Sequence, residues 1–224
     1  MTEAPESTCP FGPRYQVYWD MRYELFSRFD EARVDAAGLY TMVPEAAALH
    51  LAKRATGSRV LDVCSGIGSM SIAFARAGKQ VTAVEIDTGK VEMARHNARV
   101  YGVADRIEFL VGDITSRKLL ETLPEDIDTL FLDPPWGKGP GDYRRRGITQ
   151  LSDLALADTD LRALARGLPC REVMLRIPPN FDIDLFRDVP GDKVGFTTGS
   201  GLVHWYFVRI AKQAFVDLPD KSAP

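Results

Sequence analysis

Apolar positions along the first quarter of the chain recur at helical spacing. Tyr18, Met21, Leu25 and Phe29 follow one another at intervals of three or four residues, which predicts that they share one helical face. A second amphipathic segment begins at Pro44, a residue suited to the first turn of a helix. The pattern therefore predicts a helical N-terminal extension over residues 15–56.

The pattern changes near residue 57, where short apolar runs rich in β-formers begin to alternate with helical stretches. The runs cover residues 59–63, 80–86, 107–111, 129–133 and 172–177. Strands that alternate with helices are typical of a mostly parallel sheet covered by helices on both faces. We therefore predict an α/β domain over residues 57–212.

Three further features complete the predicted architecture. The clearest helix lies between the second and third runs, with apolar residues spaced from Val91 to Tyr101 and with Asp87 or Thr88 as its cap. The last two runs, 193–198 and 204–210, are separated by Gly199, Ser200 and Gly201 and are expected to form an edge hairpin. A mobile tail is expected over residues 1–14 and a C-terminal tail over residues 213–224.

Composition narrows the class of protein. The 28 Lys+Arg and 31 Asp+Glu give a net charge of −3, which argues against a general nucleic-acid binder and leaves only local basic patches. Three widely spaced cysteines offer neither a disulfide framework nor a CxxC metal site, so no metal is expected and a reducing, cytoplasmic setting fits. No apolar run approaches the roughly 20 residues of a membrane span, so no membrane partner is expected.

A glycine-containing turn follows the first predicted strand. Asp62 stands near the end of that strand, and Gly66 and Gly68 follow in the turn, where glycine lets a backbone approach a ligand closely. A dinucleotide fingerprint would have a third glycine where this chain has Ser71, so no pyrophosphate cradle is evident. Asp62 would suit the ammonium end of a methionine-like ligand.

Acidic residues also follow the next two strands. Glu85 ends the second run, where a carboxylate can accept hydrogen bonds from both ribose hydroxyls. Asp113 follows the third run, where it could accept from an adenine amino group. Because parallel strands end at one edge of a sheet, Asp62, Glu85 and Asp113 are expected to converge on one ligand.

The fourth run ends in Asp133-Pro134-Pro135-Trp136. The two prolines make this segment rigid and extended. The Asp133 carboxylate and the Pro134 carbonyl are two acceptors for the hydrogens of an aromatic amine, and Trp136 offers a platform on which its ring can stack.

These motifs resemble those of class I S-adenosylmethionine-dependent methyltransferases that act on exocyclic amines. The run from Trp19 to Asp30, together with Pro44-Glu45, Arg95-x-Asn97 and Pro135-Trp136-Gly137, is similar to the RNA cap guanine-N2 methyltransferases, the trimethylguanosine synthase family. The similarity spans about residues 15–210. It implies a Rossmann-like class I methyltransferase fold with a seven-stranded sheet, and a helical N-terminal extension that completes the active site.

The resemblance also implies roles for individual residues. Asp133, Pro134 and Trp136 would act on a guanine-type base, with Trp136 stacked on a cationic 7-methylguanine ring. The position of Arg144 and Arg145, just beyond Trp136 on a glycine-rich loop, indicates that they could contact substrate phosphates. Asn180 is also expected to contact the substrate, a guanine-containing nucleotide or an RNA 5′ end. The residues that would hold S-adenosylmethionine are Asp62, Gly66, Gly68, Glu85, Ile86, Asp113, Ile114 and Thr41.

The chain departs from the family pattern at positions that bear on the substrate. Asp133 stands where the family usually has Ser, while Val17 and Pro179 stand where it has Lys and Arg. The loss of two basic residues predicts a weaker dependence on cap phosphates, unless the run Arg144 to Arg146 replaces them. Two alternatives stay open: methylation of a small guanine-like or other aromatic amine, and a methyltransferase fold that has lost turnover and serves as a binding subunit.

Overall fold

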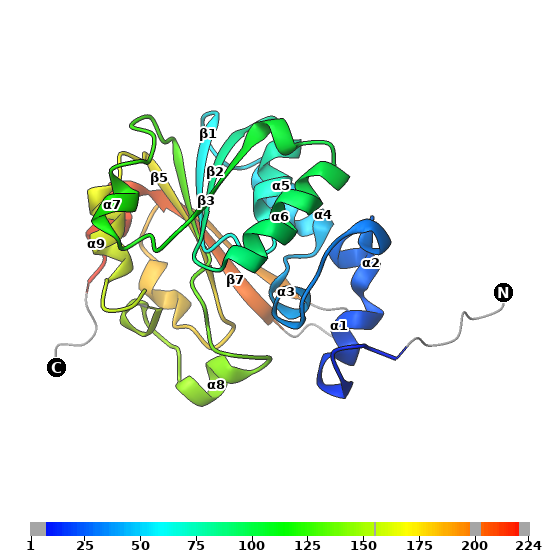
Figure 1. Cartoon of the computed structure of the whole chain (residues 1–224). Coiled ribbons are helices and arrows are strands. Elements are labelled where there is room, and N and C mark those ends of the chain that lie inside the picture. The colour runs from blue at the N-terminus through cyan, green and yellow to red at the C-terminus, as the bar shows by residue number, and fades with distance from the viewer. Residues whose placement is uncertain (1–7, 155, 198–202, 220–224) are drawn as a thin grey trace.

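A seven-stranded, mostly parallel sheet forms the centre of the protein (Figure 1). The computed structural model describes residues 8–154, 156–197 and 203–219. The strand order is β3-β2-β1-β4-β5-β7-β6, in which β1 to β5 are parallel and β7 runs antiparallel to both β5 and β6. The strands are β1 (Arg59–Val63), β2 (Gln80–Glu85), β3 (Ile107–Val111), β4 (Thr129–Leu132), β5 (Glu172–Ile177), β6 (Gly191–Thr197) and β7 (Val203–Ala211).

The five predicted parallel strands are confirmed, two of them ending one residue earlier than expected. The predicted hairpin is also confirmed, although only β6 lies at the sheet edge, because β7 is inserted between β5 and β6. Thr198 and the expected separator Gly199, Ser200 and Gly201 lie outside the described residues.

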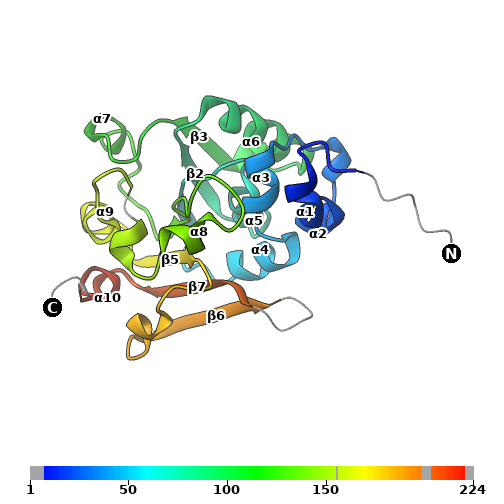
Figure 2. The same cartoon turned by 90° about the horizontal axis from the view of Figure 1, so that it is seen from below.

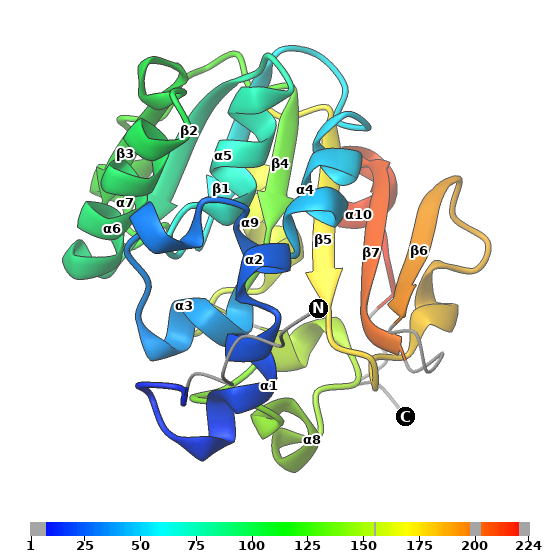
Figure 3. The same cartoon turned by 90° about the vertical axis from the view of Figure 1, so that its right-hand side faces the viewer.

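Helices cover both faces of the sheet (Figure 3). One face is covered by α4 (Glu45–Ala52), α5 (Ser69–Arg76) and α6 (Thr88–Val100), and the other by α7 (Arg117–Leu120), α9 (Leu161–Gly167) and α10 (Lys212–Val216). Neighbouring strand residues point to opposite faces, so Val60 packs in the first layer and Leu61 in the second. Asp87 caps α6, as predicted, by accepting from the backbone N–H of Gly89 and Lys90.

The N-terminal region is helical but divided into short pieces. They are η1 (Pro13–Tyr15), α1 (Gln16–Asp20), α2 (Arg22–Leu25), η2 (Phe29–Glu31) and α3 (Ala36–Thr41). The remaining short elements are η3 (Ala104–Arg106), α8 (Asp142–Arg146), η4 (Leu151–Leu154) and η5 (Ile183–Phe186). Seen from below, α1, α3 and α8 lie beyond the end of the sheet at which the parallel strands finish (Figure 2).

Parts of both expected tails are packed. Within the described residues of the N-terminal tail, Cys9 is buried and its N–H donates to Oε1 of Gln16. At the other end, Phe215 and Leu218 are buried against the second layer of the core, because α10 places them there. Apolar side chains thus draw residues 8–14 and 212–218 into the fold.

Glu45 joins the N-terminal region to the α/β domain. Its carboxylate accepts from Ser27 N at 2.8 Å, from Tyr101 Oη at 2.9 Å and from Arg76 Nη1 at 2.6 Å. Burial alone would raise the pKa of Glu45, but these hydrogen bonds lower it to about 2. Within the described residues, no helix is long and apolar enough to cross a membrane.

Candidate active site

Buried polar atoms without partners gather at one end of the sheet. Within the described residues, five buried side-chain atoms lack a hydrogen bond: Asp62 Oδ1, Ser65 Oγ, Trp136 Nε1, Arg176 Nε and Asn180 Oδ1. They belong to the carboxyl-terminal parts of the adjacent strands β1, β4 and β5 or to the segments that follow them. Because buried polar groups are normally paired, their concentration here indicates a ligand site.

The turn after β1 is shaped by its glycines and by Glu85. Gly66 has φ 56° and open space where a Cβ would stand, whereas a Cβ on Gly68, at φ 90°, would meet Ala94 of α6 at 3.1 Å. Glu85 Oε2 accepts from Gly66 N at 2.9 Å, and Oε1 accepts from Asp87 N at 3.1 Å. The buried carboxylate therefore fixes the turn and keeps lone pairs for further donors.

Asp62 is almost completely buried beside this turn, with 1% of its surface exposed. Its Oδ2 accepts a hydrogen bond from the hydroxyl of Ser71 on α5, and Oδ1 is unpaired. Burial raises the pKa of Asp62 to about 7, the Ser71 hydrogen bond opposes this, and the carboxylates of Asp133 and Glu85 raise it further. A cation bound against Oδ1 would stabilise the charged form of Asp62 and so lower its pKa.

The other expected cofactor residues lie in different environments. Ile86 is 67% exposed directly after Glu85, which makes it a large apolar side chain open to a ligand. Asp113 is exposed, and its Oδ1 accepts from the N–H and the hydroxyl of Thr115. Ile114 is 5% exposed in the hydrophobic core, so its side chain is turned away from the solvent side of the strand ends.

The residues expected to hold the guanine-type base begin at the end of β4. Asp133 Oδ2 lies 2.8 Å from Nη1 of Arg176, and this guanidinium also donates to the Thr41 carbonyl at 2.7 Å. Burial raises the pKa of Asp133, and the charge and hydrogen bond of Arg176 oppose the rise. Thr41 thus meets the site through its backbone carbonyl, since its hydroxyl donates to Ala37 O.

Trp136 is surrounded by other rings and by a cation. Tyr143 meets its indole edge to face at a centroid distance of 6.1 Å, and the Arg176 guanidinium lies 4.7 Å from its ring centroid. Asn180, on the segment after β5, has its amide oxygen buried and unpaired. The structure therefore places a carboxyl group paired with a guanidinium, a flat aromatic surface and an unpaired acceptor at the ends of two neighbouring strands.

Arg176, Ser71 and Cys64 are site residues that the sequence pattern did not reveal. Arg176 had a visible signal, because a charged residue inside an apolar central strand must find a partner when it is buried. Cys64 has φ 64° in the turn, and burial, Glu85 and Asp133 raise the pKa of its thiol. Its thiol is therefore in the neutral form at physiological pH.

The basic run near the site is partly paired. Arg145 forms an ion pair with Asp142, and Arg14 of η1 donates to Pro140 O at 3.2 Å and lies 3.6 Å from Asp142. Arg144 lies over the Tyr143 ring at 5.5 Å from its centroid. These contacts hold α8 against the N-terminal helices next to Trp136.

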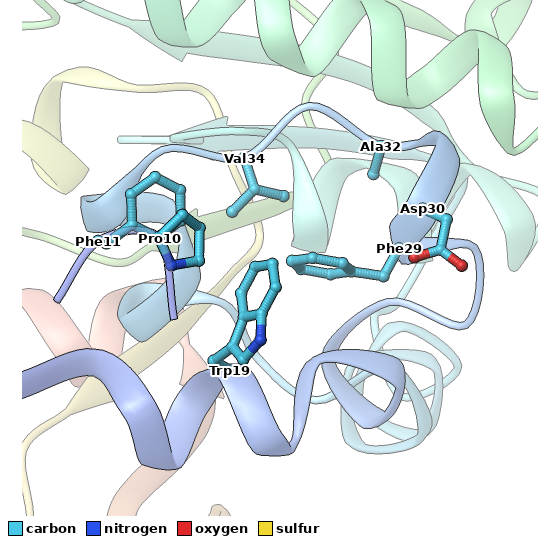
Figure 4. Close-up of a pocket in the computed structure, with 7 residues that line it drawn as sticks. All are labelled: Pro10, Phe11, Trp19, Phe29, Asp30, Ala32 and Val34. Carbon is cyan, nitrogen blue, oxygen red and sulfur yellow. The ribbon is translucent and has the colours of Figure 1, made fainter. Parts of the chain in front are cut away.

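A pocket of about 320 Å³ lies within the N-terminal region itself (Figure 4). Its lining comes from residues 10–34 alone, and the rings of Trp19 and Phe29 meet edge to face at 5.5 Å between centroids. The figure shows both rings pointing into the hollow that Phe11 and Val34 close from the other side. The family-like run from Trp19 thus builds the interior of the N-terminal region.

In the described part of the chain, no group of three or more His, Cys, Asp or Glu residues is placed to hold a metal ion.

Comparison with known proteins identifies the family. A sequence model of the RNA cap guanine-N2 methyltransferases matches residues 57–192. The chain belongs to this family. It is 36% identical over 154 residues to the trimethylguanosine synthase of Schizosaccharomyces pombe, an alignment that covers 65% of this chain and 63% of that protein. The cofactor of the chain is S-adenosylmethionine.

Other relatives act on a different base. The chain is 33% identical over 138 residues to a 23S rRNA (uracil(1939)-C(5))-methyltransferase of Acidithiobacillus ferrooxidans, an alignment that covers 58% of this chain and 31% of that enzyme. The matched region thus spans about a third to two thirds of the length of these relatives.

Solved structures show the same fold. The human methyltransferase 10 domain containing protein aligns over 92% of this chain and 99% of its own, with a TM-score of 0.63 and 14% identity. A SAM-dependent methyltransferase of Agrobacterium tumefaciens aligns over 77% of this chain and 63% of its own, with a TM-score of 0.52 and 17% identity. The expected Rossmann-like class I methyltransferase fold is therefore confirmed.

Proposed function

We propose that the protein transfers a methyl group from S-adenosylmethionine to the exocyclic N2 amine of a guanine-type base, either a 7-methylguanosine cap or a related nucleotide or RNA. The observation that carries this proposal is that the Asp133 carboxyl group and the Trp136 indole, which follow β4, both contact Arg176, while the segment after the neighbouring strand β5 holds the unpaired Asn180 oxygen. A planar base that bears an amine needs such a set of groups: acceptors in its plane and an aromatic surface beneath it.

The strand ends around β1 and β2 fit the cofactor. Asp62 Oδ1 is a buried, unpaired acceptor suited to an ammonium group, and Gly66 leaves open space beside it. Glu85 would accept from the ribose hydroxyls, and the exposed Ile86 would pack against the adenine ring. When bound there, S-adenosylmethionine supplies an electrophilic methyl group. Asp113, the backbone near Ile114 and the segment around Thr41 complete the proposed binding region.

The residues of this chain would promote transfer mainly by alignment. A guanine amine is a weak nucleophile because its lone pair is delocalised into the ring, so its orientation controls the rate. Asp133 and the Pro134 carbonyl would accept the two amine hydrogens and turn the nitrogen lone pair toward the methyl group. The amine nitrogen would become positive as the N–CH3 bond forms and the S–CH3 bond breaks, with the electron pair kept by sulfur. The Asp133 carboxylate would stabilise that charge until the proton passes to water.

Phosphate groups of the substrate would meet the α8 segment. Arg144, Arg145 and Arg146 form a cationic run beside Trp136, in a chain whose net charge is −3. The family residues usually assigned to phosphates are absent at Val17 and Pro179. We therefore propose that Arg144 and Arg145 make the phosphate contacts, with Arg145 exchanging its ion pair with Asp142 for a phosphate.

The environment of Cys64 favours an amine acceptor over the C5 carbon of uracil. That carbon becomes nucleophilic only after a strong nucleophile adds to the neighbouring ring carbon, a role that a cysteine thiolate can fill. Among the described cysteines, Cys9 and Cys170 are buried, and Cys64 carries a thiol whose pKa is raised by burial and by three carboxylates. A neutral thiol is a poor nucleophile, whereas an amine needs none.

A small aromatic amine remains the second candidate, because the acidic chain offers few phosphate contacts. The inactive-subunit alternative is weakened by the acids Asp62 and Glu85, which stay buried at the strand ends although burying a carboxyl group without a ligand is costly.

Methyl transfer with labelled S-adenosylmethionine tests the proposal. The acceptors are guanosine 5′-monophosphate, 7-methylguanosine 5′-diphosphate, a cap dinucleotide, capped RNA and a uracil-containing RNA without guanine. We expect labelled product with at least one guanine acceptor and none with the last RNA. Asp133→Ala and Trp136→Ala should lower kcat about 10²- to 10³-fold while cofactor affinity stays close to wild type. Asp126→Asn is the matched control, because Asp126 is an exposed carboxylate paired with Arg59 at the opposite end of the sheet. Near-normal turnover in the Asp133 or Trp136 variant would overturn the assigned roles.

A further inference from the structure

Arg176, the next-to-last residue of β5, contacts both the segment after β4 and helix α3. Its side chain is 6% exposed, and its Nη1 lies 2.8 Å from Asp133 Oδ2 and 2.7 Å from the Thr41 carbonyl. Asp133 follows β4, and Thr41 ends α3 of the N-terminal region. One guanidinium therefore joins the proposed acceptor carboxylate to the helices that lie over the strand ends.

The same guanidinium lies between two indole rings. Its central carbon is 4.7 Å from the ring centroid of Trp136 and 5.1 Å from that of Trp205. Trp205 is buried and stacks on Phe196 at 3.9 Å between centroids. Arg176 thus takes up one face of Trp136, held by a rigid stack from the edge hairpin, and a base that stacks on Trp136 must use the opposite face.

Among the described residues, Arg176 is the cation that acts on the Asp133 carboxyl group. Asp133 faces Asp62 from β1 and Cys64 from the turn after it, while Glu85 of β2 acts on both of those groups. Tyr18 of α1 faces Arg176. Burial raises the pKa of Asp133, and the charge and hydrogen bond of Arg176 oppose the rise.

We propose that Arg176 is a positioning residue for methyl transfer, which holds Asp133 in its charged form and fixes the plane of Trp136 for the incoming base. This inference rests on the proposed function. A protonated Asp133 would present a donor on one oxygen instead of an acceptor, and it would not stabilise positive charge on the amine. An unsupported indole would lose its fixed orientation. Because Arg176 also donates to the Thr41 carbonyl, the charge of Asp133 and the orientation of Trp136 both depend on the packing of α3 over the strand ends.

The most direct test follows Asp133 itself and needs no acceptor. Protein labelled with ¹³C at the aspartate carboxyl carbon is titrated by NMR, and the Asp133 signal is assigned by its loss in Asp133→Asn. We expect Arg176→Gln to raise the midpoint of the Asp133 titration by about one pH unit or more, because burial then acts without the opposing cation. An unchanged midpoint would overturn the proposal.

Kinetics provide the second readout. With the best guanine acceptor, Arg176→Gln should lower kcat about 10²-fold or more at neutral pH, with a smaller change in KM for S-adenosylmethionine. The acid limb of kcat/KM should move to higher pH, so that activity partly recovers as the pH rises. Arg176→Lys keeps the charge but lacks the flat guanidinium that lies over Trp136, so it should keep the wild-type pH limb with a lower kcat. A pH limb displaced equally in both variants would contradict the proposal.

A matched variant separates positioning from simple stabilisation. Arg209 of β7 forms ion pairs with Glu172 and Asp192, so Arg209→Gln removes a comparable pair elsewhere in the sheet. It should lower the melting temperature without moving the pH limb or the Asp133 titration. The double variant Arg176→Gln/Asp133→Asn should be no slower than the slower single variant, because both changes remove one interaction. If wild type methylates none of the guanine acceptors, the proposed function fails while the titration still reports on Arg176.

Discussion

The hydroxyl of Ser71 donates a hydrogen bond to Oδ2 of Asp62, across the interface between α5 and β1. Both residues are buried, with 0% and 1% of their surfaces exposed. The position at which a dinucleotide fingerprint has its third glycine thus supports a carboxylate. The other oxygen of Asp62 stays unpaired beside the open space at Gly66, where we place the ammonium group of the cofactor.

The first prediction concerns the pH dependence of cofactor binding. The pKa of Asp62 is raised to about 7, so the carboxylate is charged above that pH and protonated below it. A cationic ammonium group binds the charged form, so the affinity of wild type for S-adenosylmethionine should fall as the pH drops from 8 to 6. Asp62→Asn should weaken binding about tenfold to hundredfold at pH 8 and abolish this slope. Calorimetry across the pH range measures both, and a steep slope that persists in Asp62→Asn would contradict the assignment.

The second prediction concerns Glu85. This carboxylate accepts from Gly66 N and Asp87 N and is proposed to bind the ribose as well. Glu85→Ala should weaken the binding of S-adenosylmethionine and of its demethylated product by about tenfold to hundredfold, since a charge-assisted hydrogen bond is worth about 1.5–3 kcal/mol. Calorimetry with NAD is the specificity control. Tighter binding of NAD than of S-adenosylmethionine by wild type would show that the pocket is misassigned.

The third prediction concerns docking of the N-terminal region through Glu45. Its pKa is lowered from 4.5 to about 2, so its contribution to stability is present above pH 4.5 and is lost as the pH falls toward 2. Glu45→Gln should destabilise the protein by about 1–3 kcal/mol at pH 7, with a smaller difference from wild type at pH 3. Denaturant unfolding at the two pH values measures this. An effect of equal size at both would mean that the charge of Glu45 is not what holds the region.

The fourth prediction concerns phosphates on the substrate. If Arg144 and Arg145 make the phosphate contacts, transfer to 7-methylguanosine should already be measurable, and added phosphates should raise kcat/KM only modestly. Arg145→Ala should remove most of that gain and flatten the response to salt, because phosphate contacts carry most of the salt dependence. Arg166→Ala on α9 is a control for the loss of one positive charge. A steep gain with each phosphate that Arg145→Ala leaves unchanged would place the phosphate contacts elsewhere.

The sequence predicted the sheet well because its signals were local. Each parallel strand is a short apolar run bounded by polar residues. The Asp87 cap could be predicted because Asp87 directly precedes the first residue of α6. The carboxylates Asp62, Glu85 and Asp133 could be placed at one sheet edge from topology alone, since parallel strands end together.

Other features depend on contacts between residues far apart in the sequence. The N-terminal helices are shorter than their periodicity predicts, and side chains from separate short helices, such as Trp19 and Phe29, pack against one another. Asp113 lies two strands away from β1, in an exposed turn closed by Thr115, which topology alone did not reveal. Arg176 could be recognised as partnered, but nothing in the sequence singled out Asp133 as its partner among the acids at the strand ends.

A variant of Cys64 distinguishes methylation of a guanine amine from methylation of uracil at C5. Cys64→Ser removes the thiol nearest the strand ends, which methylation at uracil C5 would need and amine methylation would not. We expect this variant to keep turnover within a few-fold of wild type. Loss of all turnover with normal cofactor binding would favour covalent chemistry on a pyrimidine.

Identification of the methylated base distinguishes guanine-N2 transfer from its alternatives. Wild type and Asp133→Asn are incubated with S-adenosylmethionine carrying a labelled methyl group and an equimolar mixture of capped and uncapped RNAs, and the digested nucleosides are separated and identified by mass spectrometry. We expect label on the N2 amine of a guanine nucleoside in the wild-type reaction, reduced about 10²-fold or more in Asp133→Asn. Label on 5-methyluridine, or on a guanine N2 to the same extent in both proteins, would contradict it.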